Sequence, residues 1–205
     1  MADVRESFPL FPLGIVLLPT EIVPLHIFEE RYKLMIGQCV EDETEFGIVW
    51  LGDDGLRDVG CTARVAQVLE QMEDGRMNIL AQGGRPFRLL RKIEELPYPA
   101  GDIEMLDDTD DGDEALAEDA REAYADLVET VTDNRPGVDE LDGLNAYGMA
   151  ATIELAAAPK QALLEERSED ARLKTVGDLF SAALHRIENA EEAQERAKSN
   201  GKVRF

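Results

Sequence analysis

Basic residues are scarce in this chain of 205 residues. It has 21 Lys and Arg against 44 Asp and Glu, which gives a formal net charge of -23 at pH 7. Because such a chain repels phosphate backbones and anionic lipid headgroups, we expect neither nucleic acid nor a membrane as a partner. With 44% hydrophobic and 32% charged residues, the composition is that of a globular protein with one large domain or two small ones.

Cysteine and long apolar runs are also rare. The two cysteines, Cys39 and Cys61, lie in apolar stretches, so we expect buried free thiols and no disulfide framework. No stretch approaches the roughly 20 apolar residues that a membrane span needs. The apolar run from Phe8 to Leu18 is broken by prolines and a glycine and has no basic segment before it. We therefore predict a cytoplasmic protein without a secretory signal.

Sequence motifs for catalysis are equally sparse. The only Gly-Lys pair lacks the rest of a phosphate-binding loop, and His26 and His185 lie in different halves and outside any His-Glu-x-x-His pattern. A cysteine nucleophile with His26 as its base requires the two side chains to meet in space, and the preference of free cysteine for burial argues against it. We predict that the protein is not an enzyme and has no catalytic residue, metal site or cofactor.

The first hundred residues have the pattern of short strands with one helix. The predicted strands occupy residues 8–18, 22–25, 46–51, 59–73, 76–82, 87–93 and 98–106. Asp74-Gly75 predicts a type I′ hairpin turn, and Gly83-Gly84 predicts a second turn. Between 28 and 40, apolar residues recur at helical spacing, namely Phe28, Tyr32, Met35 or Ile36, and Cys39. Successive hairpins suggest a curled, mainly antiparallel sheet that closes toward a small barrel.

The chain changes character after an acidic stretch. Residues 101–120 hold ten acids and no Lys or Arg, which indicates an exposed junction. Apolar stripes at helical spacing follow over 116–131 and 173–187. Shorter helices are expected around 144–155 and 161–166, and Ser168 is the expected N-cap of the last helix. We divide the chain into a β-barrel subdomain, 1–107, and a helical subdomain, 108–205.

Three features invite a functional interpretation, and each has a simpler one. Asp107 to Glu118 has the glycine and glutamate spacing of an EF-hand loop, but no entering helix precedes it, so we interpret it as a solvated linker. Trp50 is expected to pack in the core or at the barrel rim, with ligand stacking as the alternative. One basic cluster is expected to pair with local carboxylates and not with RNA. It consists of Arg85, Arg88, Arg91 and Lys92.

Several segments, taken in order, resemble one protein family. They are Phe8-Pro9-Leu10, Val16-Leu17-Leu18-Pro19, Pro24-Leu25-His26-Ile27-Phe28-Glu29, Arg31-Tyr32, Met35, Phe46-Gly47-Ile48, Val59 to Val65, Asp74-Gly75-Arg76 and Gly84-Arg85-Pro86-Phe87-Arg88. Together they resemble the N-terminal, or substrate-binding, domain of Lon proteases. The helical half is similar more loosely, best over 155–164 and 173–187. Thr20 stands where the family often has glycine, and Pro86 interrupts its usual basic-aromatic-basic run.

The resemblance implies an α+β fold, namely a PUA-like antiparallel β-barrel with an inserted helix, followed by a C-terminal helical bundle. In Lon proteases this region contributes to recognising unfolded or tagged protein substrates and to assembling the oligomer. The ATPase and Ser-Lys protease motifs of the family are absent from these residues. The resemblance therefore implies a non-catalytic module that binds unfolded or exposed hydrophobic protein segments. The alternative is a small molecule or modified nucleotide in a barrel pocket. The binding residues and the oligomeric state are left open.

Overall fold

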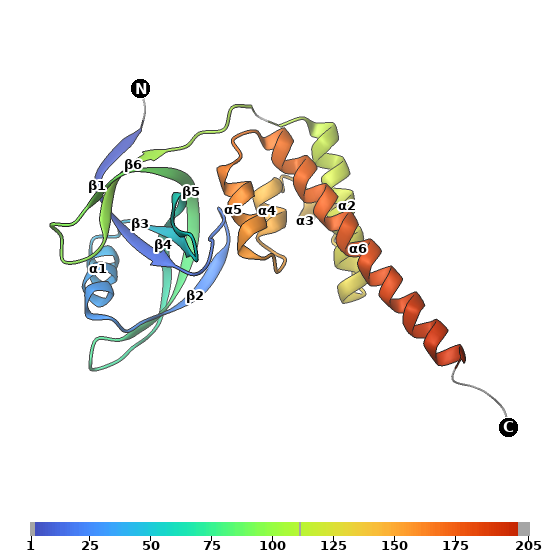
Figure 1. Cartoon of the computed structure of the whole chain (residues 1–205), viewed down its shortest axis with the longest axis horizontal. Helices are drawn as coiled ribbons and strands as arrows, with labels where there is room; N and C mark the ends of the chain where they lie inside the picture. Colours follow the sequence, from blue (N-terminus) through green and yellow to red (C-terminus); the bar gives the residue numbers. More distant parts are fainter. Residues whose placement is uncertain (1–2, 111, 201–205) are drawn as a thin grey trace.

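The computed structural model describes residues 3–110 and 112–200, which form a β-rich half beside a helical half (Figure 1). The strands are β1 (Val4–Leu13), β2 (Ile22–Ile27), β3 (Phe46–Gly52), β4 (Gly55–Gln71), β5 (Met77–Ile93) and β6 (Ala100–Met105). The helices are α1 (Glu30–Glu41), α2 (Glu114–Thr132), α3 (Val138–Leu141), α4 (Ala146–Ala150), α5 (Ala157–Glu165) and α6 (Glu169–Asn200). The predicted α+β class, with one helix inserted among the strands and the others after them, is confirmed.

The strands form one curled sheet in the order β2-β5-β4-β3-β1-β6, and β6 also pairs with β5. These pairings close a ring of five strands, while β2 lies outside the ring on the first part of β5. Register shifts interrupt four of the pairings, so the barrel is irregular. The pair β1–β3 is parallel and the others are antiparallel. A parallel pair needs a long crossover, which β2 and α1 provide here.

The inside of the ring is filled by a small apolar cluster centred on Phe87. Its other members are Phe8, Leu10, Val49, Leu89, Ile103 and Met105. The Phe87 ring occupies space that two glycines leave free, because a Cβ atom on Gly47 or Gly60 would lie 2.6 or 2.7 Å from its Cζ atom. Glycine in a strand interior commonly marks such a close approach. The packing of the Phe87 ring against β3 and β4 therefore depends on these two small residues.

A larger core continues from the strands into both sets of helices. It includes Phe46 of β3, Met35 of α1, Leu164 of α5 and Phe180 of α6, each fully buried. Two polar contacts reinforce the same junction. Lys160 of α5 forms an ion pair with Glu21, and the Gln161 amide donates to the Val59 carbonyl at 3.1 Å. The subdomain division at 107/108 stays a prediction, and the shared core packs its two parts against each other.

Two turn predictions in the β-rich half are wrong. Gly83-Gly84 lies inside β5 and does not turn the chain. Glycine is needed at Gly83 for another reason: a side chain there would collide with the Leu18 carbonyl. The hairpin loop spans 72–76, and within it only Gly75 has a positive φ, at 81°, so the turn is not type I′. The strand predicted over 8–18 ends at Leu13.

Thr20 lies in the left-handed region, with φ of 67°, and its main-chain NH donates to the Gly83 carbonyl at 3.0 Å. This conformation favours glycine, the residue that the resembling family often has there. Pro86 is accommodated inside β5 next to a register shift opposite Cys61. Proline in a sheet is normally found at such irregularities.

The helical half differs from the prediction mainly in its short helices. The helix expected over 144–155 is reduced to α4, and α3 was not predicted. The N-cap prediction for Ser168 is confirmed, because its Oγ atom accepts from the Ala171 amide at 3.2 Å. α6 packs along α2 and then projects beyond the other helices (Figure 1). No helix within the described ranges is long and apolar enough to cross a bilayer.

Candidate functional site

A groove with two lobes lies at one end of the barrel. The first lobe has a volume of about 590 Å³ and is walled by the ends of β1 and β2, the start of α1 and the β3–β4 hairpin. Its apolar side chains include Phe11, Ile27, Phe28, Tyr32, Leu51 and Leu56. The second lobe, of about 370 Å³, lies against the connection between β5 and β6, with Leu10, Leu56, Ile93, Leu96 and Tyr98 in its wall. We call the two lobes together the barrel-end groove.

Phe28 is the most conspicuous side chain of the first lobe, because 59% of its surface is exposed. It was predicted to lie on the buried face of the inserted helix, and this prediction is wrong. α1 begins at Glu30, so Phe28 belongs to the connection after β2, and the neighbouring Ile27 points into the core with 1% exposed. The ring stacks on His26 at a centroid distance of 5.8 Å. A large exposed aromatic ring beside an apolar groove is typical of a binding surface.

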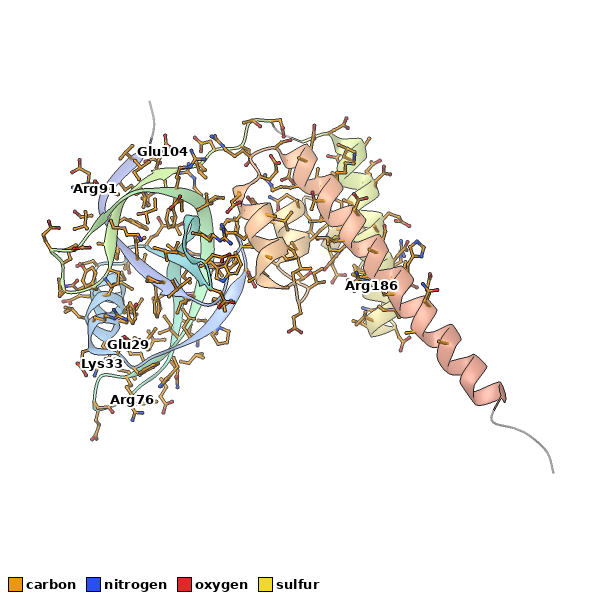
Figure 2. All side chains as sticks on the ribbon, viewed as in Figure 1. Glu29, Lys33, Arg76, Arg91, Glu104 and Arg186 are labelled. Atoms are coloured by element: carbon orange, nitrogen blue, oxygen red, sulfur yellow. The ribbon has the colours of Figure 1, made fainter. Side chains whose placement is uncertain are left out.

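Charged groups border the same groove. Arg31 donates to Glu29 at 2.9 Å, and its guanidinium lies 4.6 Å from the centroid of the Tyr32 ring. Burial raises the pKa of Tyr32. Figure 2 shows Glu29 and Lys33 near the tip of the β4–β5 hairpin, where Lys33 donates to the Asp74 carbonyl at 2.8 Å. This contact ties α1 to the hairpin, so one wall of the groove is held in place.

A second apolar groove, of about 640 Å³, lies in the helical half between α2, α6 and the segment before α5. Leu127 and Val131 of α2, Leu155 of the connecting segment and Leu179 of α6 contribute to it. Arg186, on α6 in Figure 2, lies at its border. Fewer large apolar side chains are exposed here. Val131 and Val138 are the exposed ones of the helical half within the described residues, whereas the β-rich half has eleven.

The thiols and the histidines do not form a reactive site in the described part of the chain. Cys39 and Cys61 are free and buried, as predicted, and burial raises the pKa of both thiols. His26 bonds to the Asn78 side chain at 2.6 Å, and no hydrogen bond joins it to either cysteine. His185 is exposed on α6, 3.3 Å from Glu188. A protonated, buried thiol without a base has the properties of a core residue.

The acidic stretch uses its carboxylates for structure. Asp108 bonds to Arg172, Asp110 accepts from the Glu169 amide at 2.9 Å, and Asp113 caps α2 by accepting from the Ala115 amide at 2.8 Å. Asp111, part of the EF-hand-like spacing, lies outside the described residues. Within those residues no group of three or more acidic, histidine or cysteine side chains is arranged to hold a metal ion.

Trp50 follows its simpler interpretation, and the basic cluster follows it for two of its four residues. Trp50 is half-buried against the large core, with the Arg57 guanidinium 5.2 Å from its ring, and is not a lining residue of either groove. In the basic cluster, Arg85 pairs with Asp107 at 2.6 Å and Arg91 pairs with an aspartate of β6 at 2.7 Å. Arg88 and Lys92 form no ion pair within the described ranges, and Lys92 borders both lobes of the barrel-end groove.

Comparison with known proteins identifies the family. Residues 7–181 match the model of the ATP-dependent protease La (LON) substrate-binding domain. The chain belongs to the Lon substrate-binding domain family. Among curated relatives, the Lon protease of Anaeromyxobacter dehalogenans is 29% identical over 198 residues, which cover 87% of this chain and 23% of the relative. Lon protease 2 of Myxococcus xanthus is 25% identical over 87% of this chain and 24% of the relative.

Solved structures of Lon N-terminal domains have the same fold. The Lon N-terminal domain protein from Xanthomonas campestris aligns with a TM-score of 0.64 and 24% identity over 84% of this chain and 97% of that chain. The N-terminal domain of Mycobacterium avium complex Lon protease aligns with a TM-score of 0.65 and 20% identity over 86% and 98%. The chain thus corresponds to nearly all of these domains and spans about a quarter of the length of the full Lon proteases. The match includes no ATPase or protease domain.

Sequence reasoning missed the residues that make the barrel-end groove of this Lon domain. Phe28 was assigned to a buried stripe, Arg31 was noted only as part of the family resemblance, and Lys92 only as part of the basic cluster. The one usable signal was that Lys92 lacks an ion-pair partner among the described residues although acids are abundant. Lys92 follows Arg91 in a chain with twice as many acids as bases, and the structure shows that it forms no ion pair within the described ranges.

Proposed function

We propose that this domain is a non-catalytic module that binds exposed apolar segments of other proteins in the barrel-end groove. The observation that carries the proposal is Phe28, a ring with 59% of its surface exposed at the border of an apolar groove. Complete burial of a side chain of this size contributes about 1.5–3 kcal/mol of favourable free energy. A ligand that covers the exposed part of Phe28 would therefore gain about 1–1.5 kcal/mol from this contact.

The shape of the groove supports a peptide-like ligand. It is open to solvent and extends over two lobes with Leu56 in both walls, so a segment with separated apolar side chains fits it better than one compact molecule. The alternative of a small molecule or modified nucleotide would be favoured by a closed cavity lined by Trp50. Trp50 instead packs against the core, outside the grooves described above.

Membership of the family supports the same binding function, since the family model describes a substrate-binding domain. Proteolysis is not part of the proposal, because the matched residues correspond to about a quarter of the Lon proteases. The cytoplasmic location and the lack of nucleic-acid and membrane partners, both predicted from the charge and composition, remain part of the proposal.

The test is a titration with a small protein held unfolded by reduction and alkylation of its disulfides, with the folded form of the same protein as the control ligand. We expect binding of the unfolded form only. Phe28→Ser should weaken it about tenfold, because the exposed part of the ring is lost. Leu90→Ser is the matched control, since Leu90 is 51% exposed on β5 and lies outside the groove.

Two results would contradict the proposal. One is the absence of binding to the unfolded form at high micromolar concentration. The other is an equal loss of affinity in the Phe28 and Leu90 variants, which would mean that binding is a general property of exposed apolar surface. Circular dichroism should show that both variants keep the native secondary structure.

A further inference from the structure

We propose that the barrel-end groove selects apolar segments that carry an acidic residue at their centre. This inference rests on the proposed function and specifies the ligand of the same site. It follows from two cations, Arg31 and Lys92, that border both lobes of the groove.

The two lobes share a boundary that can be stated residue by residue. The residues that border both are Pro12, Arg31, Leu56, Lys92 and Pro99. The charged members of this shared set are both cations. The acidic residues border one lobe each: Glu29 the first and Glu94 the second. The boundary between the lobes therefore carries two cations, of which Arg31 is paired with Glu29.

The two central cations are held differently. Arg31 is anchored, because it donates to Glu29 and its guanidinium stacks on the Tyr32 ring. Lys92 has no carboxylate within ion-pair distance among the residues that the structure describes. In a chain with 44 acidic and 21 basic residues, most cations can find a carboxylate. A lysine without one, at the point where two apolar lobes meet, is available to a carboxylate of the ligand.

A segment bound across both lobes places its middle over Arg31 and Lys92. A carboxylate there would form charge-assisted hydrogen bonds as the flanking apolar side chains exclude water. A neutral residue leaves Lys92 partly desolvated without a partner, whereas Arg31 keeps Glu29, and a lysine adds a third cation. The order of affinity is therefore acidic over neutral over basic at the central position.

The net charge of -23 opposes this preference at long range, since it repels an acidic ligand as a whole. At 0.15 M salt, exposed charges separated by more than about 8 Å are largely screened. The contact with the two cations then outweighs the distant acids. Because the contact itself is partly exposed, the preference should shrink toward one at about 0.5 M salt.

The experiment compares three acetylated and amidated peptides with the same apolar residues on both sides of a central Gln, Glu or Lys. Binding to the full chain is measured by fluorescence anisotropy at 0.15 M salt. We expect the Glu peptide to bind about fivefold more tightly than the Gln peptide, and the Lys peptide to bind more weakly than both. Lys92→Met should reduce the Glu-over-Gln ratio to about twofold or less.

Lys174→Met is the matched control, because Lys174 is exposed on α6, forms no ion pair in the described part of the chain and lies outside both grooves. It changes the net charge by the same amount and should keep the ratio of the unchanged protein. Failure of all three peptides to bind would refute the proposed function itself. Binding of the Gln peptide with no advantage for Glu, or an advantage that survives Lys92→Met, would refute only the charge selection.

Discussion

Arg172 joins four parts of the helical half and offers the most direct test of how this half is built. Its side chain is 1% exposed. The guanidinium bonds to Glu169 at 2.6 Å, to Asp108 at 2.9 Å and to the Glu166 carbonyl at 2.7 Å, and it stacks 4.4 Å from the Tyr147 ring centroid. We consider the substitution Arg172→Met, which keeps much of the side-chain volume and removes the charge and all donors.

The cost follows from the burial of each partner. The Glu169 side chain is 9% exposed, so the substitution leaves a buried carboxylate without its cation, which costs about 3–5 kcal/mol. Asp108 is 45% exposed, so water solvates its carboxylate once the arginine is removed. The loss of that ion pair therefore adds less than about 1 kcal/mol to the cost. Glu169 also accepts from the Ala146 amide at 2.8 Å, so its displacement would disturb the start of α4. We expect a total loss of about 3–5 kcal/mol.

The assay is urea unfolding followed by two probes. Far-ultraviolet circular dichroism reports mainly on the helices, and the fluorescence of the single tryptophan, Trp50, reports on the barrel. Arg172→Met should lower the circular dichroism midpoint strongly, and the double variant Arg172→Met with Glu169→Gln should recover part of the loss, because no buried charge remains. A loss below about 1 kcal/mol, or a double variant less stable than the single one, would refute the reasoning.

Three other predictions concern the backbone and pH. Gly60→Ala should destabilise the protein by about 2–3 kcal/mol in urea unfolding, because the new Cβ would lie 2.5 Å from a main-chain oxygen of β3, whereas Gly14→Ala, with no atom within 4 Å, should be neutral. Thr20→Gly should raise the melting temperature by about 2–4 °C, since it relieves a β-branched residue at φ of 67°. Hydrogen bonds from the Ser168 side chain and nearby main-chain amides lower the pKa of Asp110. Its stabilising effect is therefore present above the unfolded pKa and lost as pH falls through the folded one, so Asp110→Asn should differ from the unchanged protein at pH 7 and match it near pH 2.

The β-rich half could be predicted in outline because its signals are local. Alternation, turn residues and the helical spacing between 28 and 40 reflect properties of neighbouring residues, and they indicated most strands close to their observed positions. Gly83 shows where such signals fail. A glycine pair predicts a turn from its own conformational freedom, but here it serves the approach of Leu18, which is distant in sequence. The same holds for the parallel pair β1–β3, which no local pattern indicates.

The junction between the halves was predictable only as an acidic stretch. Charge repulsion among its acids indicates that the stretch is exposed, and this argument is valid for a segment without neighbours. In the folded chain Arg172 and the start of α6 bring donors to Asp108 and Asp110, so acids that would repel each other become caps and ion-pair partners. The sequence shows the charges but does not show which helix end will be next to them.

The groove depends on what the fold leaves uncovered, and this explains why its residues were missed. Ile27 and Phe28 are adjacent and both large and apolar, yet one is 1% exposed and the other 59%. The difference arises because β2 ends at Ile27 and the chain changes direction before α1 begins at Glu30. A helix starting two residues earlier would have turned Phe28 toward the core with Tyr32. The start of α1 therefore decides whether this surface has an exposed aromatic residue.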